Sequence, residues 1–302
     1  MINIILSTNK MSNIYVGAHI NREKTIIKTM ETITKNGGNC LQLFVSNPRS
    51  SSLVNIDNYI TIADDIKDYT SKNNFKLVIH SSYTINLARD LKNDKRTVPI
   101  NECIWIKILL HELYISHLIN SSGVIVHVGK HTTLSYNKGI KNMRTAIEYI
   151  VEELQKNNLK TKIIIETPAG QGTELLTNLN EFIDFYNSFS KEQKKYLGIC
   201  LDTAHIWAAD YELNEAYNII CNKNANDLIV IHLNNSSVKK GSNIDRHATL
   251  FALFDNTYGT IPLKAIKQFL ELFKNNKHVP IIILETPSIE YSQEIKWIYA
   301  SI

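Results

Sequence analysis

Cysteine is scarce in this chain, and its four copies lie far apart. They are Cys40, Cys103, Cys200 and Cys221, and no two form a Cys-x-x-Cys pair. This spacing argues against a disulfide-stabilised scaffold and against a zinc finger built on thiolates. Unpaired cysteines are typical of reducing compartments. We therefore expect an intracellular protein, with the cytoplasm, the nucleus and a virion all left open.

Long apolar runs are absent as well. Residues 1–6 are mostly apolar, but Asn3 interrupts them, and the run is too short for the apolar region of a signal peptide. No segment approaches the ~20 apolar residues that cross a bilayer. We therefore expect no membrane partner. We divide the chain into a short polar extension, residues 1–13, and one domain, residues 14–302.

Several motifs of other enzyme classes are missing too. There is no Gly-x-x-x-x-Gly-Lys phosphate loop, no Gly-x-Gly-x-x-Gly after the first apolar run and no nucleophile elbow. Charge of one sign is not dominant, because 33 Lys and Arg face 29 Asp and Glu and leave a surplus of +4. Such a surplus suits a polyanionic partner only weakly. A hydrophobic content of 44% excludes intrinsic disorder as the main state.

What the chain does contain is an alternation of short apolar runs and amphipathic segments. Eight runs are typical of strands buried on both faces: 14–18, 40–45, 77–79, 124–126, 163–165, 197–201, 228–231 and 281–284. Seven segments have helical apolar spacing: 23–33, 59–69, 104–119, 146–154, 179–189, 212–220 and 263–273. This alternation predicts an α/β fold, a single-domain (β/α)8 TIM barrel, with an open doubly wound sheet as the alternative.

Imidazoles and carboxylates follow six consecutive runs. In chain order they are His80, His127, Glu166, Asp202, His232 and Glu285. The carboxyl ends of the strands of a parallel barrel meet at one rim, where barrel active sites lie. One such residue is usually a hydrogen-bonding cap, but six in register are hard to produce by chance. We therefore predict a metal cluster at this rim. His19, after the first run, is expected to support it.

Histidines together with carboxylates suit borderline divalent metals, zinc first, with manganese or iron as substitutes. Three more candidates, His205, Asp245 and His247, lie slightly beyond the rim positions. Nine ligands are too many for one tetrahedral ion and suit two or three ions that share a bridging carboxylate. The three outlying residues could hold an ion that is set apart from the others.

Several stretches around these residues carry a family resemblance. They include HSSYTINL at 80–87, ETPAGQG at 166–172 and GICLDTAH at 198–205, with shorter matches at 15–19, 47–49, 232–234, 245–247 and 284–286. Together they resemble the endonuclease IV family of apurinic/apyrimidinic (AP) endonucleases, AP endonuclease family 2. The matches follow the family's order from Tyr15 to Glu285, which is nearly the whole chain.

The resemblance implies three zinc ions, with ligands assigned residue by residue: His80, His127 and Glu166 for the first ion, the shared Glu166 with Asp202, His232 and Glu285 for the second, and His205, Asp245 and His247 for the third. None of these nine positions departs from the family. Glu166 and Glu285 are then the catalytic residues, together with a metal-bound hydroxide. Zinc lowers the pKa of bound water to about 7, which supplies such a hydroxide at neutral pH.

The family also implies a substrate, double-stranded DNA that contains an abasic site, and an activity, base excision repair by a monomer. Incision 5′ to the site would leave a 3′-hydroxyl and a 5′-deoxyribose phosphate, and the same metals could trim blocked 3′ ends. Arg49 and Tyr83 match family residues that touch DNA near the lesion. An abasic nucleotide has no base to unstack, so turning it outward costs less than flipping a normal nucleotide.

Five features depart from the family pattern. Asn235 replaces a usual Asp, Ala204 a usual Cys and Val128 a usual Pro. Ser51 lies near a position at which the family commonly has an aromatic residue. A usual Gly-rich stretch is replaced by residues 250–258. Loss of charge at Asn235 affects the surroundings of the metals. DNA contacts from residues 250–258 are not carried over.

Two alternative functions remain open. A metal-dependent sugar isomerase or epimerase on a similar barrel shares the strand-end ligands, but it has no need for Asp245, His247, Arg49 or Tyr83. A barrel with structural metals that only binds damaged DNA would need no catalysis. The intact ligand set argues against this second alternative.

Overall fold

The computed structural model describes residues 14–251, 259–274, 278–288 and 291–302. The proposed extension, residues 1–13, lies outside this part of the chain, as do residues 252–258 of the departing loop. The boundary at residue 14 therefore stays a prediction. The four cysteines are free, as their spacing predicts.

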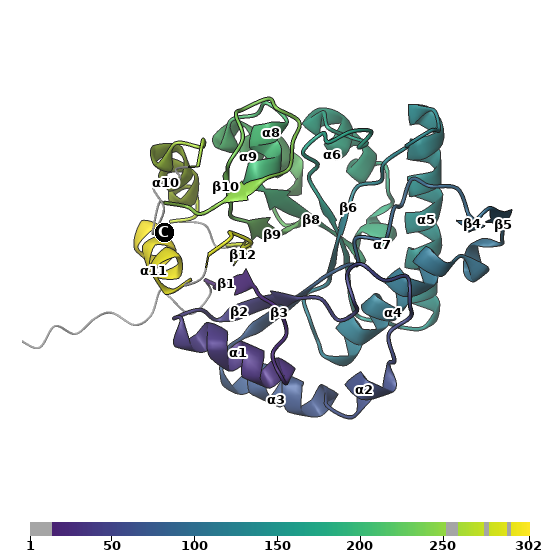
Figure 1. The fold of residues 1–302 in the computed structure, drawn as a ribbon, viewed down its shortest axis with the longest axis horizontal. Helices are drawn as coiled ribbons and strands as arrows, with labels where there is room; N and C mark the ends of the chain where they lie inside the picture. The colour runs from purple at the N-terminus through teal and green to yellow at the C-terminus, as the bar shows by residue number, and fades with distance from the viewer. Residues whose placement is uncertain (1–13, 252–258, 275–277, 289–290) are drawn as a thin grey trace, which may run out of the picture.

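Eight parallel strands close into a barrel (Figure 1). They are β1 (Val16–His19), β2 (Cys40–Leu43), β3 (Lys76–His80), β6 (Val124–His127), β7 (Ile163–Glu166), β8 (Leu197–Asp202), β9 (Leu228–His232) and β12 (Ile281–Leu284). Each strand pairs with its neighbours in chain order, and β1 pairs with both β2 and β12. The predicted TIM barrel is confirmed, and the open doubly wound sheet is wrong.

Helices surround the barrel. They are α1 (Ile26–Lys35), α2 (Asp57–Ile60), α3 (Ala63–Lys72), α4 (Ile104–Leu118), α5 (Tyr136–Lys156), α6 (Leu179–Asn187), α7 (Lys191–Lys194), α8 (Thr203–Ala208), α9 (Leu213–Asn224), α10 (Leu263–Glu271) and α11 (Ser292–Ser301), with a 3-10 turn, η1, at Ile100–Glu102. None of the helices in the described ranges combines the length and apolar character needed to cross a membrane.

Two predicted helices differ from the structure. The single helix expected over 59–69 is wrong, because the chain forms α2 and α3 with a break at residues 61–62. Thr61 donates its hydroxyl to the Asn58 carbonyl at 3.3 Å, a local bond that competes with helix continuation. Helix α5 begins earlier than expected, because the Ser135 hydroxyl accepts from the Lys138 amide and caps it.

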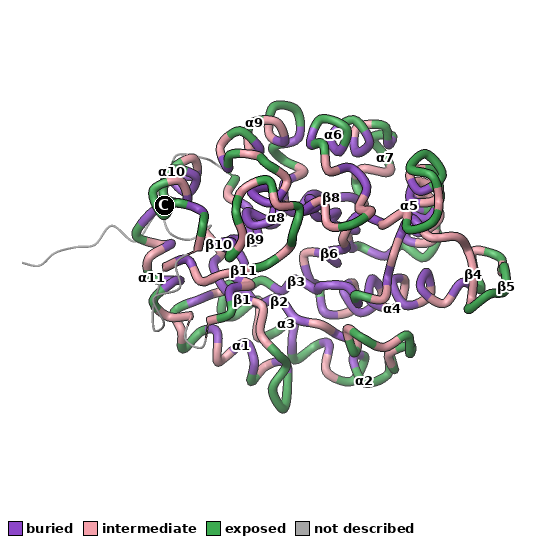
Figure 2. The backbone as a smooth tube through the Cα atoms, turned by 45° about the horizontal axis from the view of Figure 1, so that its top comes forward, coloured by how far each residue is buried: buried purple, intermediate pink, exposed green. Residues whose placement is uncertain are grey.

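The core has two layers, and Figure 2 shows buried strands within a ring of more exposed helices. One cluster of buried residues lies inside the barrel: Cys40, Val78, Ile125, Ile164, Cys200, Val230, Ile281 and Ile283. Their strand neighbours, such as Val124 and Val126, belong to the larger cluster that the helices cover. This alternation is the period of two that a strand imposes, and it decides which side chains reach the mouth of the barrel.

Two short hairpins decorate the barrel. Strands β4 (Lys92–Asn93) and β5 (Arg96–Thr97) pair between β3 and α4. Strands β10 (Asn235–Ser236) and β11 (His247–Ala248) pair after β9. The second hairpin brings Asp245 and His247 back toward the ends of the barrel strands.

Candidate metal centre

The predicted ligands project into the mouth because of the strand period. His80 lies two residues after Val78, His127 two after Ile125, and Glu166 two after Ile164. Asp202, His232 and Glu285 follow interior residues in the same way: Cys200, Val230 and Ile283. A spacing of two keeps side chains on one face of a strand, so all six side chains cap the interior layer.

Register then brings neighbouring ligands side by side. His127 is paired with Glu166 across β6 and β7, and Asp202 with His232 across β8 and β9. Adjacent parallel strands lie about 4.8 Å apart. Ligands at matched positions are therefore close enough to share one ion.

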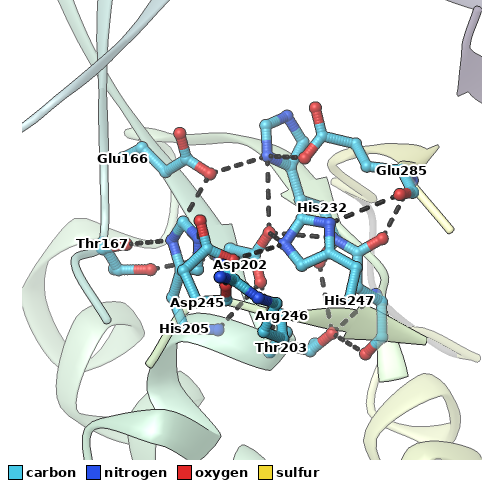
Figure 3. Close-up of polar contacts among 12 residues, drawn as sticks. Glu166, Thr167, Asp202, Thr203, His205, His232, Asp245, Arg246, His247 and Glu285 are labelled. Carbon is cyan, nitrogen blue, oxygen red and sulfur yellow. Dashed lines mark hydrogen bonds and ion pairs between the residues drawn. The ribbon is translucent and has the colours of Figure 1, made fainter. Parts of the chain in front are cut away.

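The first two groups assigned by family resemblance are each gathered within 4.8 Å: His80, His127 and Glu166 in one, and Glu166, Asp202, His232 and Glu285 in the other. Oε2 of Glu166 lies 3.7 Å from His80 Nε2 and 3.5 Å from His127 Nδ1. Its Oε1 lies 2.8 Å from His232 Nδ1. The two oxygens of Glu166 thus face different groups, as a bridging carboxylate requires. Figure 3 shows the contact of Glu166 with His232.

The third group forms around His205 and His247, which lie with Asp202 within 4.8 Å. Asp245 connects the two imidazoles, with Oδ2 at 3.3 Å from His205 Nε2 and Oδ1 at 3.2 Å from His247 Nε2. The two carboxylate oxygens of Asp202 have different partners. Oδ1 accepts from the amides of Ala204 and His205 at the start of α8, whereas Oδ2 faces His232 and His247.

The donor atoms fit divalent cations. Glu166 Oε2, His205 Nε2 and His247 Nε2 are buried and have no hydrogen-bond partner within the described residues. Buried polar atoms are normally satisfied, so three orphans pointing into one cluster indicate a missing partner. Nitrogen and carboxylate oxygen atoms are the donors that zinc accepts. Residues His80, His127, Glu166, Asp202, His205, His232, Asp245, His247 and Glu285 would hold the ions.

Hydrogen bonds on the far side of the His80, His205 and His232 rings fix which nitrogen faces the cluster. The Nδ1 atoms of His80 and His205 lie 2.8 Å from the carbonyl oxygens of Ser81 and Thr167. Since a carbonyl only accepts, these bonds place the proton on Nδ1 and leave Nε2 as the ligand atom. The ring of His232 is turned the other way, because its Nε2 bonds to a side-chain oxygen and Nδ1 faces Glu166.

The charges of the cluster compensate one another. Burial raises the pKa of a carboxyl, but surrounding histidines, His127 first, outweigh this and hold the pKa of Glu166 well below its usual range. Burial lowers the pKa of an imidazole, but the charge of Asp202 and the contact with Asp245 outweigh this and raise the pKa of His247 to about 9. The carboxylates therefore stay ionised and favour cations, whether protons or metals.

Cys200 also lies near Glu166 and His232. Burial raises the pKa of its thiol to about 12. Cys200 belongs to the apolar layer inside the barrel, below the ligands, and its strand position predicts a packing residue.

Two supporting residues were missed in the sequence. Gln42 is buried in β2, donates from Nε2 to Glu285 Oε1 at 2.6 Å and accepts from His232 Nε2 at 2.8 Å. Asn234 donates to Asp202 Oδ2 at 2.8 Å. Gln42 follows the interior residue Cys40 by two positions, so the strand period was a signal that could have found it.

His19 meets its expected supporting role. Its Nδ1 lies 3.0 Å from Glu285 Oε1. Burial lowers the pKa of His19 despite this carboxylate. The same Nδ1 also lies 3.0 Å from Gln42 Nε2, so His19 packs against both Gln42 and Glu285 from the side of β1.

The two predicted DNA contacts lie on neighbouring loops. Tyr83 is 57% exposed and stands over the cluster, with its ring 5.6 Å from that of His80 and 6.3 Å from that of His127. Arg49 is exposed and lies outside the cluster. The Tyr83 amide donates to the Pro48 carbonyl at 2.9 Å, which joins the two loops.

Asn235 stands where the family usually has Asp. Its side chain forms hydrogen bonds with the backbone of a loop and not with a candidate metal ligand. Its Nδ2 donates to the carbonyls of Leu250 and Ile261 at 3.3 and 3.1 Å. Its Oδ1 accepts from the amides of Ser236 and Ile261 at 2.7 and 2.9 Å. A carboxylate could accept but not donate, so the amide is what this loop requires.

Comparison with known proteins gives concordant matches. A family model described as a xylose isomerase-like TIM barrel matches residues 30–301. "Probable endonuclease 4" of Halothermothrix orenii is 32% identical over 244 residues, which cover 77% of this chain and 82% of that protein. "Probable endonuclease 4" of Clostridium botulinum is 30% identical over 292 residues, with coverages of 93% and 96%. "Putative endonuclease 4" of Acanthamoeba polyphaga mimivirus is 28% identical over 303 residues, with coverages of 93% and 89%.

Solved structures match over the same length. Endonuclease IV from Thermus thermophilus superposes with a TM-score of 0.68 at 20% identity and covers 95% of this chain and 98% of its own. A D-tagatose 3-epimerase-like protein also gives a TM-score of 0.68, at 15% identity, with coverages of 95% and 96%. At such identities both matches show the fold alone.

Proposed function

The chain belongs to AP endonuclease family 2, and from this membership we propose that it is a zinc-dependent endonuclease of DNA base excision repair. It hydrolyses the phosphodiester 5′ to an abasic site in double-stranded DNA. The products are a 3′-hydroxyl and a 5′-deoxyribose phosphate, and blocked 3′ ends are trimmed by the same centre.

One observation carries the proposal. Nine side chains from the barrel strands, α8 and the β10–β11 hairpin gather into three adjoining groups with orphaned donor atoms. Relatives named endonuclease 4 align with this chain over most of their length. Three adjoining cation sites suit a phosphodiester, because its hydrolysis concentrates negative charge on several oxygens.

Zinc ions bound here would lower the pKa of a water molecule and neutralise phosphoryl charge. The protein's own part is to position them. Glu166 faces two groups with its two oxygens. Gln42 and His19 hold Glu285 from neighbouring strands. Because these supports are buried hydrogen bonds, the ligand geometry is set before substrate arrives.

Tyr83 and Arg49 supply recognition around the reacting phosphate. The exposed ring of Tyr83 beside His80 and His127 provides an apolar face for a sugar that has lost its base. Arg49 carries a guanidinium on the adjoining loop, where it reaches a phosphate of the bent strand. Neither contact depends on base identity, which suits an enzyme that selects missing bases.

The proposal is tested by incision of a labelled duplex that contains one abasic site. Purified protein should contain close to three zinc ions by elemental analysis and should cut 5′ to the site. A chelator should abolish cutting, and zinc should restore it. Glu166→Ala and Glu285→Gln should each abolish incision, while Glu152→Ala, at an exposed position of α5, should leave it intact.

Three results would contradict it. Full activity of a metal-verified Glu166→Ala protein would refute the bridging role of this carboxylate. Interconversion of an aldose and a ketose without DNA binding would favour the isomerase alternative. Tight binding of abasic DNA without strand scission by the zinc-loaded protein would favour the non-catalytic alternative.

A further inference from the structure

A hollow of about 560 Å³ lies beside the amino-terminal turns of α5. Its lining includes Arg89, Lys92, Lys138 and Lys141. The tip of the β4–β5 hairpin adds the exposed Lys95 and Arg96. These six residues are called the basic patch. Figures 1 and 2 both place the hairpin beside α5, at the right of the molecule.

The positive charge of the basic patch is largely uncompensated. Its six cations face three carboxylates of the same connection, Asp90, Asp94 and Glu102, which leaves a surplus of three. Lys92 pairs with Asp90 at 3.5 Å. Within the described part of the chain, no ion pair involves Arg89, Lys138 or Lys141. Many lysines on other helices, such as Lys72 with Asp68, do have acidic partners.

Hydrogen bonds of two asparagine side chains hold the backbone of the basic patch in place. The Asn93 side chain accepts from the Ile104 amide at 2.8 Å and donates to the Glu102 carbonyl at 3.0 Å, which fastens the hairpin to the start of α4. The Asn142 amide donates to the Ala88 carbonyl at 3.1 Å and to Asp90 at 3.2 Å. These bonds hold the 88–90 segment, which precedes the hairpin, against α5.

The patch also lies on the same face as the metal centre. Residues 81–103 follow the carboxyl end of β3, and α5 begins after the carboxyl end of β6, so both connections belong to the active rim. A groove of about 410 Å³ that includes Tyr83 and His127 extends to Asn86 and Lys130. Asn86 bonds to the backbone of Lys130 in both directions at 2.9 Å. Arg89 follows three residues later.

We propose that the basic patch binds the phosphate backbone of one arm of the duplex, beyond the abasic site. This inference rests on the proposed function and names a second contact region for the same substrate. Duplex DNA carries one negative charge per about 1.7 Å of its axis, so an arm lying across the rim presents successive phosphates to fixed cations. The contact lies to one side of the mouth and therefore concerns one arm only.

The test uses two duplexes of about 26 base pairs with an abasic analogue and a non-hydrolysable linkage on its 5′ side. The site lies about 6 base pairs from one end or from the other, so that each duplex has one long arm. Dissociation constants of the zinc-loaded protein are measured by fluorescence anisotropy across a salt series. The double variant Lys138→Ala/Lys141→Ala should bind one of the two duplexes about three- to tenfold more weakly and lower its salt slope by one to two.

Binding of the other duplex should be unchanged. Single-turnover incision of a normal abasic duplex at saturating enzyme should be unchanged too, because the patch does not touch the reacting phosphate. Lys95→Ala/Arg96→Ala at the hairpin tip should give the same one-sided loss. Lys160→Ala/Lys223→Ala, exposed at the opposite end of the barrel, should have no effect.

An equal loss on both duplexes, or no loss for either patch variant, would overturn the inference. If either of these results is found while the wild-type protein cuts abasic DNA normally, only the inference about the basic patch fails and the proposed function stands. If the wild-type protein binds abasic DNA but never cuts it, and the patch variants lose binding to one duplex only, the role of the basic patch stands and the proposed nuclease activity is refuted. A protein that neither binds nor cuts abasic DNA would refute both.

Discussion

At the scale of single residues, Gln42 shows how a neutral side chain organises charged ligands. Its side-chain amide donates to Glu285, the residue after β12, and accepts from His232 at the end of β9. It thereby sets the proton of His232 on Nε2 and leaves Nδ1 for a metal. An apolar residue of similar size would remove both functions without opening the barrel.

Gln42→Leu should weaken zinc binding by about 10- to 100-fold and lower incision in limiting zinc. Excess zinc should restore a large part of the activity, because the ligands themselves are intact. Competition with a chromogenic chelator measures the affinity. Gln155→Leu, on an exposed position of α5, is the matched control. Equal zinc affinities in both variants would contradict the role of Gln42.

Glu112 is a second residue whose environment has a measurable consequence. It is fully buried on α4, where its Oε1 accepts from the Ser46 hydroxyl at 2.6 Å and the Ser82 amide at 3.1 Å. It therefore joins the loop after β2 to the loop after β3, the two loops that carry Arg49 and Tyr83. Burial raises the pKa of this carboxyl from 4.5 to about 7.

The sign of its pH effect follows from proton counting. Between about pH 4.5 and pH 7 the folded chain keeps a proton on Glu112 that the unfolded chain releases, so stability falls as the pH rises. A tenfold difference in proton affinity is worth about 1.4 kcal/mol, which gives a loss on the order of 3 kcal/mol by pH 8. The Glu112→Gln protein should lack this loss of stability between low and high pH. Guanidinium unfolding at pH 5 and pH 8 measures the difference between the two proteins, and parallel pH dependences would refute it.

At the scale of elements, the connection from β10 to α10 depends on one amide. Asn235 donates to two carbonyls and accepts from two amides, and Leu250 lies three residues beyond His247. Asn235→Asp should therefore destabilise the fold by about 1–3 kcal/mol, because two buried carbonyls lose their donor. The third zinc ion should also be bound less tightly.

Denaturant unfolding and bound-zinc stoichiometry measure these two effects. Asn222→Asp, at an exposed position of α9, should change neither. If Asn235→Asp retained both the stability and the full zinc content of the wild-type protein, the hydrogen bonds of Asn235 would not be what holds this connection.

The barrel strands could be predicted because each is a short apolar run with polar residues at its ends. The break between α2 and α3 could not, because the apolar stripe from Tyr59 to Tyr69 continues through it. What interrupts the helix is tertiary and local bonding, including the Tyr59 hydroxyl on the Val45 carbonyl at 2.6 Å. Periodicity reports which face is apolar, but it does not report where a hydroxyl finds its acceptor.

In the candidate site, too, some features could be predicted from the sequence and others could not. Residues at the ends of apolar runs could be found by position, and the family resemblance grouped them into three sets. Gln42 was missed because the apolar run around it continues to Val45, so no polar end marks it. The pairing of Asp245 with both His205 and His247 depends on how the β10–β11 hairpin folds back, which spacing alone does not give.

At the scale of the whole molecule, the mouth joins strands from most of the barrel. Ligands come from β3, β6, β7, β8 and β9, from the residue after β12, and from α8 and the β10–β11 hairpin. Metal ions held there therefore cross-link segments from residue 80 to residue 285. A ligand that binds only the folded chain stabilises it by mass action, by about 4 kcal/mol at a thousandfold excess over the dissociation constant.

Removal of metal should lower the thermal unfolding midpoint, by at least about 5 °C for a protein of this size. Zinc should restore the midpoint in proportion to the ions bound, as calorimetry and elemental analysis measure together. Asp245→Ala, which affects the third group alone, should show a smaller drop on chelation than the wild-type protein, because it starts with fewer ions. A chelated wild-type protein that unfolds at the same temperature as the zinc-loaded one would mean that these side chains hold no tightly bound cations.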